Sequence, residues 1–213
     1  MTRKHQSRHQ GTTAPYRDLA AFDDRADRYD HGWRGRLHHE ISNRTADLVI
    51  ARAASPNRVL DLGCGTGYLL RVLAGHYPDA EEFMGVDAAP RMIEVANSVA
   101  HDIRLTFSFG VAEQLSCQDG VIDLIVSTTS FDHWSDQQAG LIECARILRP
   151  GGSLVLVDQF SCWFLPTRLM SRRGKARTKR RANRLLLRAG FQRPEWHNLY
   201  AAIIKAVIAT KPA

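Results

Sequence analysis

Apolar positions follow two different periods along this chain from residue 58 onward. Short apolar runs have the length of buried strands, and the stretches between them have the apolar spacing of amphipathic helices. The expected strands are 58–62, 82–87, 103–110, 121–127 and 153–160, and the expected helices are 66–76, 90–100 and 136–148. A turn is expected at Pro150, Gly151 and Gly152. Strands that alternate with helices predict a parallel, doubly wound α/β sheet with right-handed crossovers.

The two ends of the chain depart from this rhythm. Two helical patterns precede the first strand, and a basic helical stretch at about 175–189 is followed by β-like runs at 191–199 and 201–210 that are close enough to pair antiparallel. The pattern therefore predicts one domain, 16–213, in three parts: an N-terminal helical cap (16–54), a core (58–158), and a C-terminal basic helix with a β-hairpin (159–213). Residues 1–15 are polar and basic, and are expected to form a disordered leader rather than a secretory signal.

Composition changes this picture little, but the charge distribution adds to it. The chain has 213 residues, 44% of them hydrophobic, which suits a single domain with a sizeable core. The formal charge of +7 is local, because the stretch between Asp158 and Glu195 has eleven Lys and Arg residues and no acid. Outside that stretch, 18 basic residues face 22 acidic ones, so no general affinity for nucleic acid follows. No apolar run reaches the length of a membrane span.

Cysteine and histidine spacing indicates neither a metal site nor a disulfide framework. The four cysteines are widely separated, without a C-x-x-C pair, so free thiols in a reducing cytoplasm are expected. His38 and His39 are adjacent but have no further ligand residue at metal spacing, and solvated side chains are the favoured interpretation.

Three glycines follow the first expected strand, in VLDLGCGTG at 59–67. In open parallel sheets, ligands bind beyond the carboxyl ends of the strands, where glycine permits positive φ and close approach of a ligand to backbone. The dinucleotide fingerprint G-x-G-x-x-G would need a glycine at position 68, where this chain has Tyr68. No Lys-Ser/Thr pair follows the loop, so a phosphate-cradling P-loop is also excluded.

Two acidic residues narrow the choice of ligand. Asp61 stands two positions before Gly63, where a carboxylate repels a phosphate and attracts a cationic group. Asp87 ends the second strand, 20 residues after Gly67, the position from which a carboxylate binds ribose hydroxyls. The alternative for Asp87 is a cap for the helix that begins at Pro90. The ligand implied is a nucleoside with a positive, amino-acid-like end and no phosphate.

These segments together resemble the class I S-adenosylmethionine (SAM)-dependent methyltransferases. The matching stretches are VLDLGCGTG (59–67), GVDAAPRMIEVAN (85–97), AEQL (112–115), IDLIVS (122–127) and ARILRPGGSLVLVD (145–158). FDDRADRYD (22–30) is similar to the leader helix of quinone-biosynthesis C-methyltransferases, and LLLRAGF (185–191) to the segment before the family's sixth strand. The resemblance implies SAM as cofactor and a Rossmann-like, seven-stranded sheet with the last strand antiparallel.

The resemblance also implies roles for individual residues around SAM. In it, Gly63, Gly65 and Gly67 line the methionine moiety, and Asp61 lies near its amino group. Asp87 holds the ribose, and Ala88 and Met92 flank the adenine. Ala112 and Glu113 lie along the adenine edge, and Ser127 or Thr128 lies near the methionyl part. The family often has Gly-Asp-Ala before the adenine edge, whereas this chain has Gly-Val-Ala at 110–112. The contact to the adenine amino group is therefore absent or moves to Glu113.

Methyl transfer from a sulfonium requires chiefly that the acceptor is aligned and water excluded. His133, directly after the fourth strand, is the candidate base for an O or C acceptor, and a structural histidine is the alternative. Tyr29 is placed to close over the cofactor, and an ordinary core or surface tyrosine is the alternative. Aromatic residues expected near the same edge suggest an apolar pocket for a small molecule, or else a cap over the core: Trp33, Phe131, Trp134, Phe160, Trp163 and Phe164.

Three hypotheses for function follow. The first is a methyltransferase that acts on the O, N or C atom of a small-molecule acceptor; the absence of Asn/Asp-Pro-Pro-Tyr after the fourth strand argues against amino groups of bases or glutamine. The second is a phospholipid or RNA methyltransferase whose basic segment, 168–188, contacts an anionic lipid surface or RNA. The third is a SAM-binding protein without catalysis.

Overall fold

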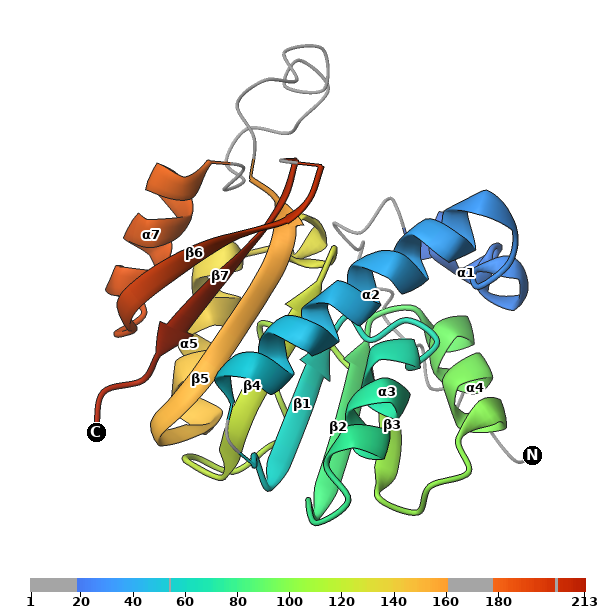
Figure 1. The fold of residues 1–213 in the computed structure, drawn as a ribbon, viewed down its shortest axis with the longest axis horizontal. Coiled ribbons are helices and arrows are strands. Elements are labelled where there is room, and N and C mark those ends of the chain that lie inside the picture. The colour runs from blue at the N-terminus through green and yellow to red at the C-terminus, as the bar shows by residue number, and fades with distance from the viewer. Residues whose placement is uncertain (1–18, 54, 161–177, 202) are drawn as a thin grey trace, which may run out of the picture.

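The sheet has the order β3-β2-β1-β4-β5-β7-β6 in the computed structural model, which describes residues 19–53, 55–160, 178–201 and 203–213 (Figure 1). Its strands are β1 (Arg58–Leu62), β2 (Glu82–Asp87), β3 (Leu105–Phe109), β4 (Ile122–Thr128), β5 (Leu148–Gln159), β6 (Gln192–Tyr200) and β7 (Ile204–Thr210). The first five pair in parallel, and β7 runs antiparallel to both of its neighbours. The predicted α/β fold class, a doubly wound seven-stranded sheet with its last strand antiparallel, is confirmed.

Helices cover both faces of the sheet. They are α1 (Leu19–Asp23), the 3₁₀ turn η1 (Ala26–Arg28), α2 (Gly32–Arg52), α3 (Tyr68–His76), α4 (Pro90–Val99), the 3₁₀ turn η2 (Phe131–His133), α5 (Gln137–Ile147) and α7 (Lys179–Arg188). Buried residues of α2, α3 and α4 pack on one face, and those of α5 and α7 on the other. Across the described residues, no helix is long and apolar enough to cross a membrane.

The fifth strand and the N-terminal segment differ in detail from the prediction. β5 begins at Leu148 rather than Ser153, because the expected turn is an irregularity within the strand, where the register to β4 shifts. There Gly151 has a φ of +77° and its N–H bonds the Lys211 carbonyl, which keeps the irregular stretch attached to the chain end. FDDRADRYD (22–30) does not form one helix. It comprises the last residues of α1, the turn η1 and the residues that follow η1. The predicted leader, 1–15, lies outside the described residues.

Side-chain alternation on the central strands decides which residues meet beneath α2. On β1, Val59 packs with the α2–α3 side of the core, whereas Leu60 and Leu62 pack with the α5–α7 side. Successive side chains point to opposite faces of a sheet, so Asp61 shares the face of Val59. On β4 the same rule places Thr128 on the face of Leu124 and Val126.

The order of the strands places a switch point between β1 and β4. The chain proceeds from β1 outward to β2 and β3, and then returns to β4 on the other side of β1. The loops after β1 and β4 therefore leave the carboxyl edge of the sheet side by side and turn to opposite faces. In open α/β sheets this is where ligands bind.

Gly85→Ala tests how tightly the sheet packs beside Asp61. A Cβ at Gly85 would overlap the Phe107 ring and would lie 2.8 Å from the Cys64 Sγ. Overpacking of this kind costs about 1–3 kcal/mol, and we expect the free energy of unfolding, measured by chemical denaturation, to fall by that amount. Gly75→Ala is the matched control, because Gly75 is exposed near the end of α3 and a Cβ there meets nothing within 4 Å. That variant should gain up to ~1 kcal/mol from helix propensity; an equal loss in both variants would contradict the packing argument.

Candidate functional site

A pocket lies at the switch point, where ligands bind in open α/β sheets. The glycine loop and the end of β4 form one wall, and residues from the turn before α2 and from α2 itself form the other. The pocket therefore joins the carboxyl edge of the sheet to the N-terminal helices. Among the predicted site residues, those that line it are Tyr29, Asp61, Gly63, Gly65 and Thr128.

The glycine loop has a backbone that other residues rarely adopt. Gly63, Gly65 and Gly67 have φ values of +75°, +53° and +76°. A Cβ on Gly63 would overlap the Ser130 hydroxyl, and one on Gly65 would fill space beside the Tyr29 ring. Gly63 and Gly65 thus keep the backbone of this wall bare, as close approach of a ligand requires.

Asp87 fixes the glycine loop from the end of β2. Its Oδ2 accepts a hydrogen bond from the Gly65 N–H at 2.8 Å, and its Oδ1 accepts one from the Ala89 N–H at 2.9 Å. Each carboxylate oxygen can accept a further hydrogen bond. Burial raises the pKa of Asp87, and the two N–H donors oppose that rise. Asp87 therefore caps the turn into α4, and it retains acceptor capacity toward a ligand.

Asp61 is the buried carboxylate of the pocket. It is 2% exposed, and its Oδ1 has no hydrogen-bond partner among the described residues. Burial, and then the charge of Asp87, raises the pKa of Asp61 to about 8. The buried Oγ1 of Thr128 also lacks a partner among the described residues. Since buried polar atoms are normally paired, this wall fits a ligand that brings hydrogen-bond donors, above all a cationic one.

Helix α2 supplies two histidines that sequence reasoning placed in solvent, and that interpretation is wrong. His39 Nε2 lies 2.9 Å from Asp30 Oδ1, and its ring stacks on Tyr68 with the centroids 3.8 Å apart. His38 stacks on Tyr29 at 4.8 Å, with 3.4 Å between its Nδ1 and the Tyr29 hydroxyl. Burial lowers the pKa of His38 and raises the pKa of Tyr29 to about 12. Both histidines line the pocket.

The residues predicted along the adenine do not line this pocket. Met92 is buried against Ala26 and Ala89. Ala88 is half-buried, and Ala112 is buried in the core of the α5–α7 face. The Glu113 Oε1 accepts a hydrogen bond from the Asp136 N–H at 2.8 Å, at the start of α5. The remaining predicted glycine is Gly67, where an added Cβ would meet the Phe107 ring. Gly67 does not line the pocket.

His133 lies outside the pocket lining, in the turn η2. Its ring meets the Phe22 ring edge-on, with the centroids 5.2 Å apart. Asp158, a buried carboxylate at the end of β5, accepts a hydrogen bond from the neighbouring Asp132 N–H at 3.0 Å. Burial raises the pKa of Asp158, and the nearby His133 lowers it. The role of His133 as a base stays a prediction.

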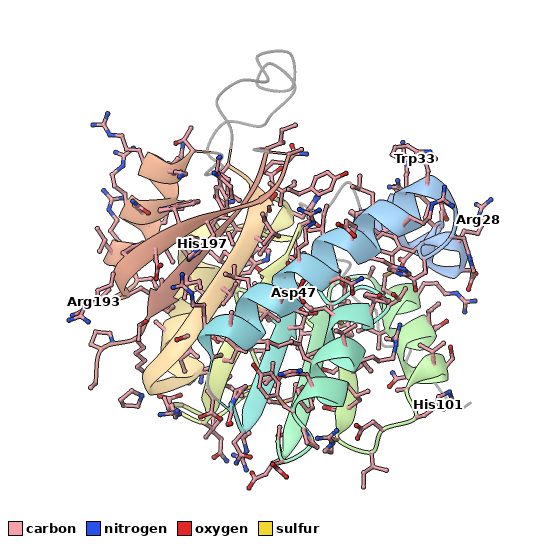
Figure 2. All side chains as sticks on the ribbon, in the orientation of Figure 1. Arg28, Trp33, Asp47, His101, Arg193 and His197 are labelled. Atoms are coloured by element: carbon pink, nitrogen blue, oxygen red, sulfur yellow. The ribbon has the colours of Figure 1, made fainter. Side chains whose placement is uncertain are left out.

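The predicted aromatic pocket is a part of the core instead. Phe131, Trp134 and Phe160 are buried and pack together, with ring centroids 5.0 Å and 6.2 Å from Phe131. Trp33 is 65% exposed and points away from the sheet at the start of α2 (Figure 2). The other two aromatic residues, at 163 and 164, lie outside the described residues.

Several pocket residues were not found from the sequence: Asp30, His38, His39, Ser42 and Thr129. The three residues on α2 reach the site through the packing of that helix against the sheet, which no local motif encodes, and Asp30 lies in the turn before it. Thr129 has a φ of +54°, an unusual value for a β-branched residue, directly after β4. Such backbone strain concentrates at functional sites, but only the structure reveals it.

Comparison with known proteins agrees with this geometry. Residues 59–152 match a family model described as a methyltransferase domain. Over these residues the chain is similar to class I S-adenosylmethionine-dependent methyltransferases. It is 34% identical over 117 residues to the uncharacterized methyltransferase YcgJ of Bacillus subtilis, and 36% identical over 117 residues to demethylmenaquinone methyltransferase of Thermus thermophilus. Each match covers 54% of this chain, and respectively 45% and 52% of the relative. The chain thus spans about half the length of these curated relatives.

Solved methyltransferase structures share the fold. A chain from the complex of the Haloferax volcanii Trm112 methyltransferase activator with a putative methyltransferase has a TM-score of 0.75 at 21% identity, covering 90% of this chain and 98% of that one. A possible histamine N-methyltransferase of Thermotoga maritima has a TM-score of 0.69 at 19% identity, covering 91% and 99%. At these identities the likeness concerns the fold alone.

The raised pKa of Asp61 predicts a pH dependence of stability. A free aspartate ionises near 3.8, whereas Asp61 in the folded chain ionises near 8. As pH rises between these values, the unfolded state gives up a proton that the folded state keeps, so stability falls. In the ligand-free protein we expect the free energy of urea unfolding to drop from about pH 5 to about pH 8, and to drop less in Asp61→Asn. Asp119→Asn, at an exposed carboxylate, is the control; an equal drop in wild type and Asp61→Asn would contradict the burial of an unpaired carboxyl.

Proposed function

We propose that this chain transfers the methyl group of S-adenosylmethionine to an O, N or C atom of a small-molecule acceptor. The observation that supports it most is the pair Asp61 and Asp87 at the glycine loop. Asp61 has a buried oxygen without a partner among the described residues, and Asp87 fixes the loop while retaining acceptor capacity. A dinucleotide or a nucleoside phosphate would place its charge against both carboxylates. SAM carries instead an ammonium group and two ribose hydroxyls, and it supplies a methyl group on a good leaving group.

In this proposal the two carboxylates divide the cofactor between them. Asp61, with Thr128, binds the ammonium of the methionine end against the bare backbone of Gly63 and Gly65. Asp87 accepts hydrogen bonds from the ribose. The predicted adenine contacts, Ala88, Met92, Ala112 and Glu113, remain part of the proposal, and Tyr29 covers the glycine loop from the side of α2.

Two imidazoles are candidates to accept a proton from the acceptor. His39 lines the pocket, where Asp30 holds one ring nitrogen and the Tyr68 ring fixes the plane. A carboxylate that orients an imidazole in this way is the arrangement of many general bases. His133 lies beside the buried Asp158 but outside the pocket lining. The geometry favours His39.

The two other hypotheses predict different products in a methyl-transfer assay. A phospholipid or RNA methyltransferase would label lipid or RNA fractions, and a non-catalytic SAM-binding protein would label none. A screen with tritiated-methyl SAM over metabolite, lipid and RNA fractions separates the three. Label in the small-metabolite fraction supports the proposed function, whereas SAM binding without transfer to any fraction would favour the non-catalytic alternative.

Titration calorimetry with SAM tests the assignment of Asp87. Asp87→Ala should weaken SAM binding by one to two orders of magnitude, roughly the loss of one or two charge-assisted hydrogen bonds. Asp47→Ala, the same change on the exposed surface of α2, is the control (Figure 2). An unchanged affinity in Asp87→Ala would remove this residue from the cofactor site. NAD serves as the counter-ligand, and binding of NAD without binding of SAM would overturn the proposal.

Chemical rescue distinguishes the two candidate bases once the screen has supplied an acceptor. We expect His39→Ala to lower kcat strongly at unchanged SAM affinity, and added imidazole to restore part of the rate, because the lost group is a proton acceptor. Asp30→Asn should lower kcat less, since it only loosens the orientation of the imidazole. His133→Ala is the parallel variant. If imidazole rescues His133→Ala and not His39→Ala, the assignment is reversed.

A further inference from the structure

Helix α7 presents a cationic face whose orientation is fixed by the rest of the molecule. Ala182 and Leu186 are fully buried in the core beneath the helix. Lys179 lies over the Trp196 ring, with its Nζ 5.1 Å from the ring centroid, and the Trp196 Nε1–H donates to Asn183 Oδ1 at 2.9 Å. These contacts hold one side of α7 against β6. The opposite side is therefore kept outward.

The outward side of α7 gathers four arginines and one leucine. We call it the α7 face, and it consists of Arg180, Arg181, Arg184, Leu187 and Arg188. At 3.6 residues per turn these side chains fall within an arc of about 120°, opposite the two buried residues. All five are exposed, Leu187 to 57%. In Figure 2 the side chains of α7 project outward from the left edge of the molecule.

The charge of this face has no counterpart in the described part of the chain. None of its four arginines forms an ion pair there, and the first turn of α7 contains no acidic residue. The acid that follows along the chain, Glu195, is engaged by Arg52 at 2.8 Å. Cations in the first turn of a helix also oppose the helix dipole. Helix stability therefore does not account for Arg180 and Arg181, whereas Arg188 in the last turn has the favourable sign.

The shape and composition of the face favour a lipid surface over a nucleic acid. Single-stranded nucleic acids bind in grooves where bases stack on aromatic rings. The α7 face is the convex side of a helix without an aromatic residue, and the nearby Trp196 ring is occupied by Lys179 and Phe160. An exposed leucine among arginines instead suits the boundary between headgroups and acyl chains, where arginine pairs with phosphate and leucine inserts.

We propose that the α7 face docks this protein on anionic lipid bilayers. Each arginine near such a surface strengthens binding about fivefold at physiological ionic strength. The first turn of α7 begins at the edge of the sheet where β5 ends, which is also the edge that bears the pocket (Figure 1).

Vesicle co-sedimentation of the full chain tests the proposal without an acceptor or cofactor. We expect the protein to bind phosphatidylcholine vesicles that contain about 30% phosphatidylserine, to leave them in about 0.5 M salt, and not to bind pure phosphatidylcholine. The triple variant Arg180→Gln, Arg184→Gln, Arg188→Gln should lower the partition coefficient about a hundredfold. Leu187→Gln should lower it several-fold with the charge unchanged.

A charge-matched control is available on the N-terminal helices. Arg28, Arg34 and Arg36 are exposed, and their triple replacement by glutamine removes the same charge. Circular dichroism of each variant establishes that it is folded. An equal loss of binding in the control triple, or full binding by the folded α7 triple, would overturn the proposal. So would an RNA oligonucleotide that binds through the same arginines while anionic vesicles do not bind.

Discussion

The carboxylates of Asp61, which is buried, and Asp87, which is half-buried, are the constraint around which the candidate site is arranged. They lie at the carboxyl ends of neighbouring strands, and the charge of Asp87 raises the pKa of Asp61. Asp87 is stabilised by two backbone N–H groups, and through them it fixes both the glycine loop and the start of α4. In the described part of the chain the Asp61 Oδ1 has no such donor, and burial together with the charge of Asp87 raises the pKa of Asp61 to about 8. A cationic ligand stabilises the ionised form of the Asp61 carboxyl, so its charge offsets the unfavourable ionisation of that group in the folded protein.

The glycine loop follows from the same constraint. The Gly63 and Cys64 N–H groups both bond the Val86 carbonyl, at 2.7 Å and 3.2 Å, and the Gly65 N–H bonds Asp87. A backbone that turns this sharply toward β2 takes positive φ at its glycines, and it leaves no side chain between the loop and a ligand. The loop is therefore shaped by β2 as much as by its own sequence.

How much of the site could be predicted depended on how local its determinants are. The glycine loop and Asp61 were identified because a strand and the turn after it are encoded in consecutive residues. Thr128 was named only through the family resemblance, with Ser127 as the alternative. His38 and His39 were misplaced because they reach the pocket through α2, whose packing against the sheet depends on contacts far along the chain. Helix α2 also has polar residues on much of its surface, so its buried side gives a weak periodic signal. The aromatic residues could not be assigned to a pocket or to the core, because an apolar side chain suits both equally.

The segment before α2 contacts both α4 and the glycine loop. Ala26 packs on Met92, at the start of α4, and Tyr29 covers the glycine loop. The ion pair between Asp27 and Arg91 joins the same elements, but both side chains are about half exposed, so it contributes little. Apolar burial therefore holds the segment on α4, and α4 in turn begins at the N–H groups that Asp87 binds. In the proposed function, a ligand that engages Asp87 therefore acts on the helix that carries this cover.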